Sequence, residues 1–388
     1  MQVSSFLKKA FATFGVTLLL LNSAQAKCDQ SPSIQKNKEK EKREPVPFAF
    51  SYSKDMSLQK PIDFHFYGDF IVMQAQEDGL DYAILDALVQ QRVVDSFPAN
   101  DTLPINNGAV QGFSTGQQSW SWDLGFRIGV GGILPHADWN LDLNWLSFAI
   151  SEEVSESVKS LGGFIPLWSL NMYNVPDPSH ESCSARWHVK VNTVDSTMSK
   201  PYYVSRYFVL NPFWGLRGAS IQQNYTARYS GIFGDVVEIG ANGPVKTQAT
   251  NNFWGLGPRI GFSSEWLLAV SNLKFINSLS FSALAGSFYL NQQVPSYATS
   301  EYHSNFRTIA MNMDLQLGLG WGIHFNEDRH FFSLTAMYEY QQWWDQNQMR
   351  ITQTKDPVVG VNTTISSDVV SRGDLRLNGF LFRFQFDF

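Results

Sequence analysis

The sequence has little charge and no long apolar run, and each shortage excludes a class of protein. Charged residues make up 16% of the 388 residues, which is low for a surface that meets water on every side. After residue 26 no continuous apolar stretch is long enough to cross a bilayer as a helix. An inner-membrane helix bundle is therefore excluded. The formal net charge of −6 gives no sign of nucleic-acid binding.

Motifs for catalysis and metal binding are also lacking. The sequence contains no G-x-S-x-G and no phosphate-binding glycine loop between a strand and a helix. None of the seven histidines has metal-ligand spacing with a cysteine or carboxylate partner. We therefore expect no enzyme activity, no metal and no cofactor.

Aromatic residues are abundant instead, and the clearest pattern is at the end of the chain. Aromatics make up 14% of the sequence, with 30 Phe and 12 Trp. In Phe380–Phe388 a phenylalanine occupies every second position, so in a strand all five rings share one face. A transmembrane β-barrel needs such a strand, because its outer face meets lipid and its inner face is polar.

The other end of the chain reads as a secretory signal followed by a linker. Lys8 and Lys9 precede an apolar stretch that is too short to span a membrane, and Ala24-Gln25-Ala26 is an A-x-A cleavage site. We expect residues 1–26 to be a signal peptide and 27–60 a flexible, charged periplasmic leader. Residues 61–388 would then form the barrel.

Alternating stretches recur between these ends and predict about ten antiparallel strands, with a range of 10 to 16. They cover 62–75, 120–131, 139–150, 185–194, 206–223, 252–264, 276–290, 309–323, 331–344 and the terminal strand. Connections alternate long and short, which predicts long extracellular loops near 76–118, 151–184, 225–250, 291–305 and 346–371, and short periplasmic turns. Further strands are candidates at 78–85 and 164–173. Trp120, Trp122, Trp139, Trp254, Trp343 and Trp344 are expected near strand ends, in the interfacial girdles.

The first long loop also carries apolar residues at helical spacing. Leu80, Ile84, Leu88 and Val89/Val93 predict a short helix that either plugs the barrel mouth or packs on its outer rim.

Charged residues at inward positions are the candidate functional residues. An arginine facing lipid at mid-bilayer costs about 2–4 kcal/mol, so these arginines must point into the lumen. The predicted pore-lining residues are Asp123, Arg127, Arg217, Arg259, Asp314, Glu339 and Arg383. Charged rings tune ion selectivity in pores; alternatively, salt bridges between them fill a narrow barrel. Glycines alternating on the same face leave room for backbone or solute.

Three groups of motifs stand out: Trp120–Arg127 with Leu134-Pro135-His136 and Leu143-Asn144-Trp145, then Asn211–Ala219 and Asn251–Arg259. They resemble the major outer membrane protein-like pore-forming family of Legionella and environmental chlamydiae. The resemblance covers about residues 60 to 388 in patches. It implies an outer-membrane barrel with porin-like activity and supplies no catalytic residues.

From these observations we expect a porin in the outer membrane of a Gram-negative bacterium, with a water-filled channel for small hydrophilic solutes and ions. The alternative is a sealed barrel that acts as a structural or adhesive surface protein through its outer loops. Expected partners are outer-membrane lipid, small solutes and the barrel assembly machinery, through the strand ending at Phe388. A second copy of the chain is a further candidate partner, and nucleic acid is not.

The cysteines and one group of loop residues give two further expectations. Only Cys28 and Cys183 are present, whereas chlamydial relatives use many cysteines to cross-link the envelope; free thiols or intermolecular bonds are favoured over an intrachain disulfide. His180 with Glu181 and Asp177 would be the acid–histidine group of a barrel-borne hydrolase, the weakest of the three functional hypotheses.

Overall fold

The structure is a computed structural model that describes residues 63–86, 109–112, 121–134, 139–157, 163–168, 181–205, 207–230, 245–268, 272–294, 300–325, 330–354, 366–370 and 373–388. The expected signal peptide and leader, Cys28, Trp120 and His180 lie outside these residues. Among the described residues, no helix is long and apolar enough to cross a membrane.

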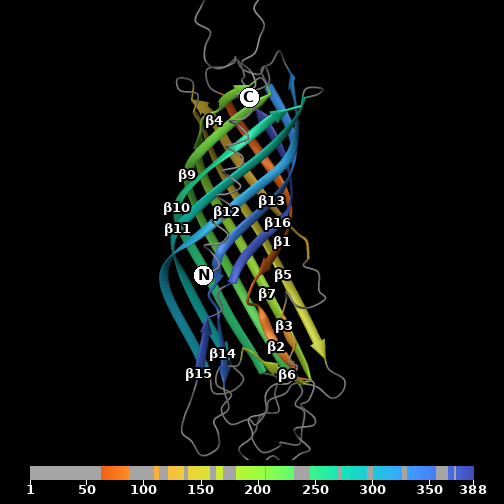
Figure 1. Cartoon of the computed structure of the whole chain (residues 1–388), viewed down its shortest axis with the longest axis vertical. Coiled ribbons are helices and arrows are strands. Elements are labelled where there is room, and N and C mark those ends of the chain that lie inside the picture. Colours follow the sequence, from red (N-terminus) through yellow and green to blue (C-terminus); the bar gives the residue numbers. More distant parts are fainter. Residues whose placement is uncertain are drawn as a thin grey trace, which may run out of the picture. The chain divides into compact units, whose positions relative to one another are not determined.

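Ten antiparallel strands close into a barrel, as the sequence predicted (Figure 1). They are β1 (Asp63–Glu77), β4 (Asp123–Leu134), β5 (Trp139–Ser157), β7 (Ser182–Ser199), β9 (Phe208–Ser230), β10 (Val245–Leu267), β11 (Leu273–Val294), β12 (Ser300–Phe325), β13 (His330–Asn347) and β16 (Gly373–Asp387). Each pairs with its neighbours in chain order, apart from the short strands between them, and β16 pairs with β1. A short strand, β8 (Tyr202–Ser205), pairs with the start of β9.

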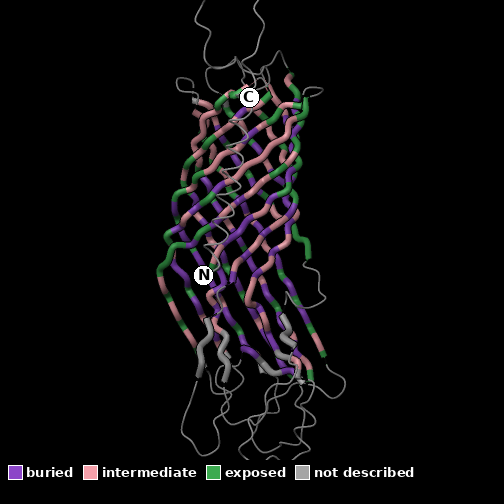
Figure 2. The backbone as a smooth tube through the Cα atoms, viewed as in Figure 1, coloured by how far each residue is buried: buried purple, intermediate pink, exposed green. Residues whose placement is uncertain are grey.

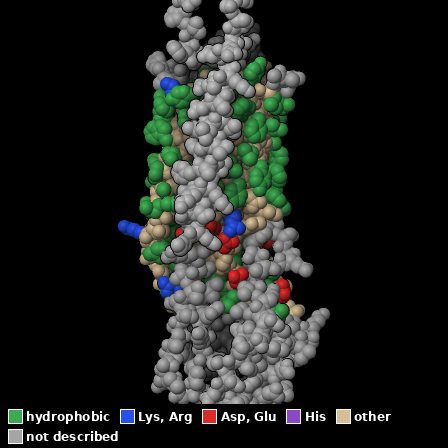
Figure 3. Space-filling model, viewed as in Figure 1, with side chains coloured by type: hydrophobic (Ala, Val, Ile, Leu, Met, Phe, Trp, Pro, Cys, Tyr) green, Lys and Arg blue, Asp and Glu red, His purple; other side chains and the backbone are tan. Residues whose placement is uncertain are grey.

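The alternation of outward apolar residues with inward residues explains why these segments form barrel strands. On β16, Phe380, Phe382, Phe384 and Phe386 are exposed on the outer face, while Leu381 is fully buried. The last residue, Phe388, exchanges two backbone hydrogen bonds with Phe64, of 2.9 and 3.1 Å. Hydrophobic side chains cover much of the barrel surface in this view (Figure 3). An exposed apolar band is the surface that lipid requires.

Toward one end of the barrel the alternation inverts. On β9, Trp214 and Leu216 face outward, but farther along the strand the outward residues are polar, and Tyr225 and Tyr229 face inward and are buried (Figure 2). Several strands therefore extend beyond the apolar band into water, with an apolar interior there. The expected loops at 151–184, 225–250 and 291–305 are accordingly shorter than predicted, since β5, β7, β9, β10, β11 and β12 occupy parts of them.

Two small sheets lie at this same end (Figure 1). One pairs β2 (Asp81–Asp86) with β3 (Ala109–Gly112) and β6 (Gly163–Pro166), and the other pairs β14 (Arg350–Thr354) with β15 (Ser366–Val370). The helix expected from Leu80 onward is wrong over Asp81–Asp86, because β2 bonds to both β3 and β6 there. The added strands expected at 78–85 and 164–173 exist in part, as β2 and β6. They belong to the small sheet with β3 and are not strands of the barrel wall.

Two residues lie in surroundings that differ from those predicted for them. Trp343 is fully buried inside the barrel rather than in a girdle, because it shares the inward face of β13 with Glu339 and Gln341. Cys183 lies in β7 rather than in a loop, and it is a buried free thiol. Trp122 and Trp254 are exposed on the outer face, as girdle residues are.

Candidate functional site: a charge belt and a closed mouth

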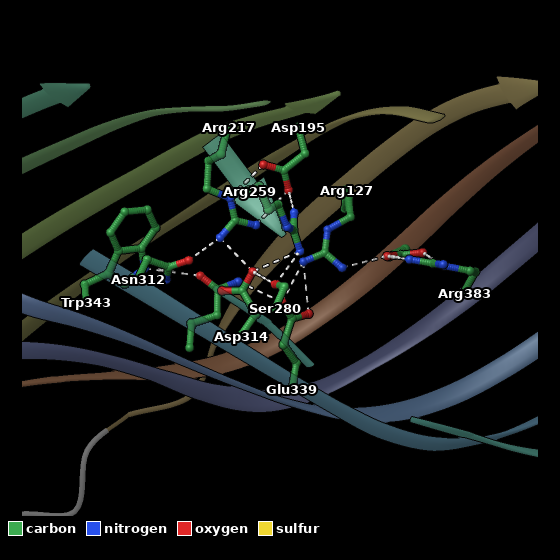
Figure 4. A network of polar contacts seen from close by, with 12 residues as sticks. Arg127, Asp195, Arg217, Arg259, Ser280, Asn312, Asp314, Glu339, Trp343 and Arg383 are labelled. Carbon is green, nitrogen blue, oxygen red and sulfur yellow. Dashed lines mark hydrogen bonds and ion pairs between the residues drawn. The ribbon is translucent and has the colours of Figure 1, made fainter. Parts of the chain in front are cut away.

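Eight charged side chains from eight of the barrel strands meet inside the barrel and form what we call the charge belt (Figure 4). They are Asp69 (β1), Arg127 (β4), Asp195 (β7), Arg217 (β9), Arg259 (β10), Asp314 (β12), Glu339 (β13) and Arg383 (β16). With four arginines and four carboxylates, the formal charge of the belt is zero.

One half of the belt is built around Asp69. Arg383 donates to both oxygens of Asp69, at 2.8 and 2.9 Å, and Arg127 donates to it from the other side at 3.2 Å. Arg127 also donates to both oxygens of Glu339, at 2.7 and 3.0 Å. The register sets these contacts, because Asp69 lies directly opposite both Arg127 and Arg383 on the neighbouring strands.

The other half is built around two aspartates. Arg217 donates Nε and Nη2 to the two oxygens of Asp195, both at 2.7 Å, and its Nη1 lies 2.6 Å from Asp314 Oδ2. Arg259 also contacts Asp195 and donates Nη2 to Asp314 at 3.0 Å. Ser280 on β11 accepts from Arg259 and donates to Asp314. Every charge in the belt therefore has at least one partner of opposite sign.

The belt side chains are shielded from water. Exposed fractions are 0 to 7% for Asp69, Arg127, Glu339, Arg217, Asp195 and Asp314, rising to 11% for Arg259 and 22% for Arg383. Trp343 packs beside Arg217, with the guanidinium 6.0 Å from the ring centre. A paired, desolvated network of this kind is a packed layer of the interior.

Inward-facing glycines make room for this filling. A Cβ at Gly129 would overlap the Tyr67 ring, one at Gly131 would overlap His65, and one at Gly322 would overlap Phe331. Tyr67 and His65 in turn both contact Asp142, at 3.0 and 3.2 Å. At these positions the space that glycine leaves is occupied by neighbouring side chains.

Six of the seven predicted pore-lining residues are brought together in the belt. Asp123 is not among them: it lies exposed at the first position of β4, and among the described residues its carboxylate accepts a hydrogen bond from the next backbone amide only. Sequence reasoning missed Asp69 and Asp195. Asp69 continues the inward series Asp63, His65, Tyr67, so the alternation could have found it. Asp195 has the parity of Trp187, Val189 and Val191, the apolar face of the predicted strand 185–194, so the same rule would have pointed it to lipid.

Beyond the belt, a plug closes the extended end of the barrel. We call β2, β6, Leu167 and Trp168 the mouth plug. Trp168 donates to the Asp81 carbonyl at 2.5 Å, and Tyr229 on the barrel wall donates to the Tyr82 carbonyl at 2.6 Å. Thr247 on β10 donates to the Trp168 carbonyl at 2.7 Å.

Aromatic packing completes the closure of the mouth. The Trp168 ring lies 4.5 Å from that of Tyr225, and both are buried. Burial raises the pKa of Tyr82 well above its ordinary value, and Cys183 and Glu156 act in the same direction, so the phenol stays neutral. Between plug and belt the interior contains an apolar core that includes Met73, Phe148, Val191, Ile221 and Phe253. A buried polar pair also lies there, in which Gln223 donates to Glu77 at 2.9 Å.

Within the described part of the chain, no group of three or more His, Cys, Asp or Glu side chains is placed to hold a metal ion. Six of the seven charged residues of the sequence prediction, all except Asp123, form a salt-bridged layer together with Asp69 and Asp195.

Comparison with known proteins gives one decisive match. The family model described as Legionella pneumophila major outer membrane protein precursor matches residues 59–388. No curated protein matches this chain.

Among solved structures, three matches cover most of this chain at low identity. The outer membrane protease OmpT from Escherichia coli is 10% identical with a TM-score of 0.41, covering 87% of this chain and 99% of that one. The toluene transporter TbuX from Ralstonia pickettii is 11% identical with a TM-score of 0.26, covering 84% and 88%. The toluene transporter TodX of Pseudomonas putida is 10% identical with a TM-score of 0.26, covering 84% and 89%.

The family match covers the whole described barrel, and the exposed apolar band and closed ten-strand sheet agree with it. The chain is an outer-membrane β-barrel of a Gram-negative bacterium and belongs to the Legionella major outer membrane protein family.

Proposed function

We propose that this protein is a sealed outer-membrane barrel that acts as a structural or adhesive surface protein through its extended outer end. The observation that carries the proposal is the charge belt, in which every arginine and carboxylate is paired and nearly all are shielded from water. An open channel would keep such groups hydrated. The mouth plug supports the same proposal, because it is hydrogen-bonded to the barrel wall at the extended end, on the far side of the apolar core from the belt.

The orientation follows from the connections. The end with both chain termini of the barrel has the short connections, and in bacterial barrels that end faces the periplasm. The plug and the polar extensions of β5, β7, β9, β10, β11 and β12 then lie outside the cell. That outer end is where the proposal places contacts with neighbouring molecules, and it includes no catalytic activity.

Single-channel recording of the refolded barrel in a planar bilayer tests the proposal. We expect no stepwise openings that scale with salt concentration from protein whose folding is verified by its heat-dependent gel mobility. Salt-dependent openings of the unsubstituted protein would overturn it.

The second candidate is a diffusion porin for small hydrophilic solutes and ions. What supports it is the composition of the belt, because four arginines and four carboxylates on the inner wall would give a selective passage once plug and belt separate. It predicts openings whose ion preference changes in Arg127→Glu or Arg259→Glu. The same recording therefore distinguishes the two candidates.

The terminal strand is proposed to mediate assembly. Phe388 is exposed and its backbone is bonded to Phe64, so the strand that closes the barrel also presents the terminal aromatic expected by the assembly machinery.

A further inference from the structure

The outer surface of β10, β11 and β12 carries a polar depression directly beyond the apolar band. Its volume is about 590 Å³, and it is lined by Thr250, Asn252, Tyr289, Asn291, His303 and Asn305. The register places these side chains in two adjacent rows across the three strands, Asn252–Tyr289–Asn305 and Thr250–Asn291–His303. We call this depression the amide pocket.

The chemistry of the amide pocket suits a sugar. Three asparagines supply both donors and acceptors, and the buried Oδ1 of Asn291 has no hydrogen-bond partner. Tyr289 leaves 46% of its surface exposed, so its ring is available to pack against the apolar face of a sugar ring. Carboxylates are absent from the lining, and His303 is held by Glu301 at 3.2 Å at the far edge.

Arg307 lies in the next row toward the membrane. The row runs Trp254–Ser287–Arg307, and Ser287 in the middle is buried. Arg307 is exposed and forms no ion pair with any other described residue. A free guanidinium at this height binds phosphate well, because its fork of donors matches phosphate oxygens.

Below Arg307 a track of two small side chains, Ala285 and Ala283, continues into the apolar band. Ala285 and Ala283 face outward on β11. Ala285 lies between Leu256 and Ile309 in one row, and Ala283 lies beside Met311 in another. Leu256, Ile309 and Met311 are 54 to 65% exposed. The two alanines therefore form a strip of small side chains beside taller ones, against which an acyl chain can pack.

These three features follow one another along the strand direction, from polar pocket to cation to apolar track. We propose that this face is a binding site for the phosphorylated glycolipid of the outer leaflet, with its sugars in the amide pocket, a phosphate on Arg307 and an acyl chain along Ala283 and Ala285. The occupant is fixed by this order, because a glycolipid embedded in the membrane presents the same sequence of groups at the same depth. The site is independent of whether the barrel conducts.

The test measures binding of fluorescently labelled lipopolysaccharide with a truncated core to the full-length barrel in phosphatidylcholine nanodiscs. We expect saturable binding that weakens about tenfold in Arg307→Glu and in Ala285→Trp. Tyr289→Ala and Asn305→Ala weaken it as well. Heat-dependent gel mobility confirms that each variant is folded.

Matched controls separate this site from general attraction. Lys190→Glu makes the same charge change on the exposed outer face of β7, and Ala336→Trp makes the same steric change on the outward face of β13; both should bind as the parent does. Equal loss in the controls, or no loss in Arg307→Glu and Ala285→Trp, would overturn the proposal. The deacylated core oligosaccharide should bind at least about tenfold more weakly, and equal affinity would refute the assignment to a membrane lipid. The conductance recording does not bear on either result.

Discussion

Asp195 on β7 and Arg217 on β9 lie directly opposite each other and form a two-point ion pair in the middle of the barrel, with both N–O distances at 2.7 Å. The same carboxylate also contacts Arg259. Asp314 contacts the same two arginines, so two aspartates neutralise two guanidinium groups in a place that is shielded from water.

Removing Asp195 should destabilise the barrel. Asp195→Asn leaves four buried arginines with three carboxylates, and an unpaired buried charge typically costs about 3–5 kcal/mol. The free energy of unfolding, from urea titration in detergent micelles, should fall by that amount. Asp195→Asn/Arg217→Met leaves the Arg259–Asp314 pair, 3.0 Å apart, and a neutral belt, so it should recover much of the loss.

The control for this experiment is the pair Arg186–Glu153 on the outer face. Both side chains are more than half exposed, and exposed pairs contribute about 0–1 kcal/mol. Arg186→Ala should therefore leave the unfolding transition almost unchanged. A loss in Asp195→Asn as small as in Arg186→Ala would show that the belt is hydrated.

Position 129 should tolerate only glycine, because the Tyr67 ring fills the space next to it. A Cβ there would overlap the Tyr67 ring, and overpacking costs about 1–3 kcal/mol, so Gly129→Ala should lower the free energy of unfolding in the same urea titration. Gly68→Ala is the matched control, because its Cβ would point into open space on the outer face of β1. Gly129→Ala combined with Tyr67→Leu should restore most of the loss, whereas an unrestored double variant would refute the proposed contact.

The mouth plug should shield Cys183 from reagents in water. In a Cys28→Ser background the only thiol is Cys183, which is 3% exposed and lies close enough to Tyr82 to affect its pKa. Labelling by a small maleimide should be slow in the folded parent and much faster in Trp168→Ala, because that change removes the ring that closes the mouth. Trp122→Ala, on the exposed outer face, should label as slowly as the parent. Fast labelling of the folded parent would contradict a closed mouth.

The sequence predicted the strand count and most of the belt, because within the membrane one alternation rule holds throughout. Apolar residues such as Trp214 and Leu216 must face lipid, so Arg217 must face inward. The rule does not say which residues will pair, and Asp69 was missed because it carries no signal beyond its inward parity. Asp195 was missed because it has the parity of Val189 and Val191, which lie beyond the band, where apolar residues face inward. Pairing depends on the register between strands, which only the closed sheet fixes.

The outer end was predicted less well for a different physical reason. Outside the lipid, apolar residues face inward and polar residues face outward. A search for outward apolar residues therefore finds a strand only as far as the edge of the lipid-facing apolar band and misses its extension. Tyr225, Ala227 and Tyr229 continue β9 with this opposite parity. The strand β2 was mistaken for a helix because short apolar runs fit both periods, and its strand pairing is set by β6, which comes about 80 residues later in the chain.

The inversion on β9 places the membrane boundary between Leu216 and Gln222, and cysteine accessibility in intact cells should locate it. These residues are six apart, about 20 Å along a strand. In the Cys28→Ser background, an impermeant maleimide added to cells should label Gln222→Cys and Asn224→Cys but not Trp214→Cys or Leu216→Cys, which face lipid. Gln223→Cys, whose native side chain is fully buried, should also stay unlabelled, since successive residues face opposite sides of the wall. Tyr202→Cys at the other end, exposed in β8, should react only after the outer membrane is permeabilised. If Tyr202→Cys reacted in intact cells and Gln222→Cys did not, the barrel would have the opposite orientation. In that case the amide pocket would face the periplasm, away from the glycolipid of the outer leaflet.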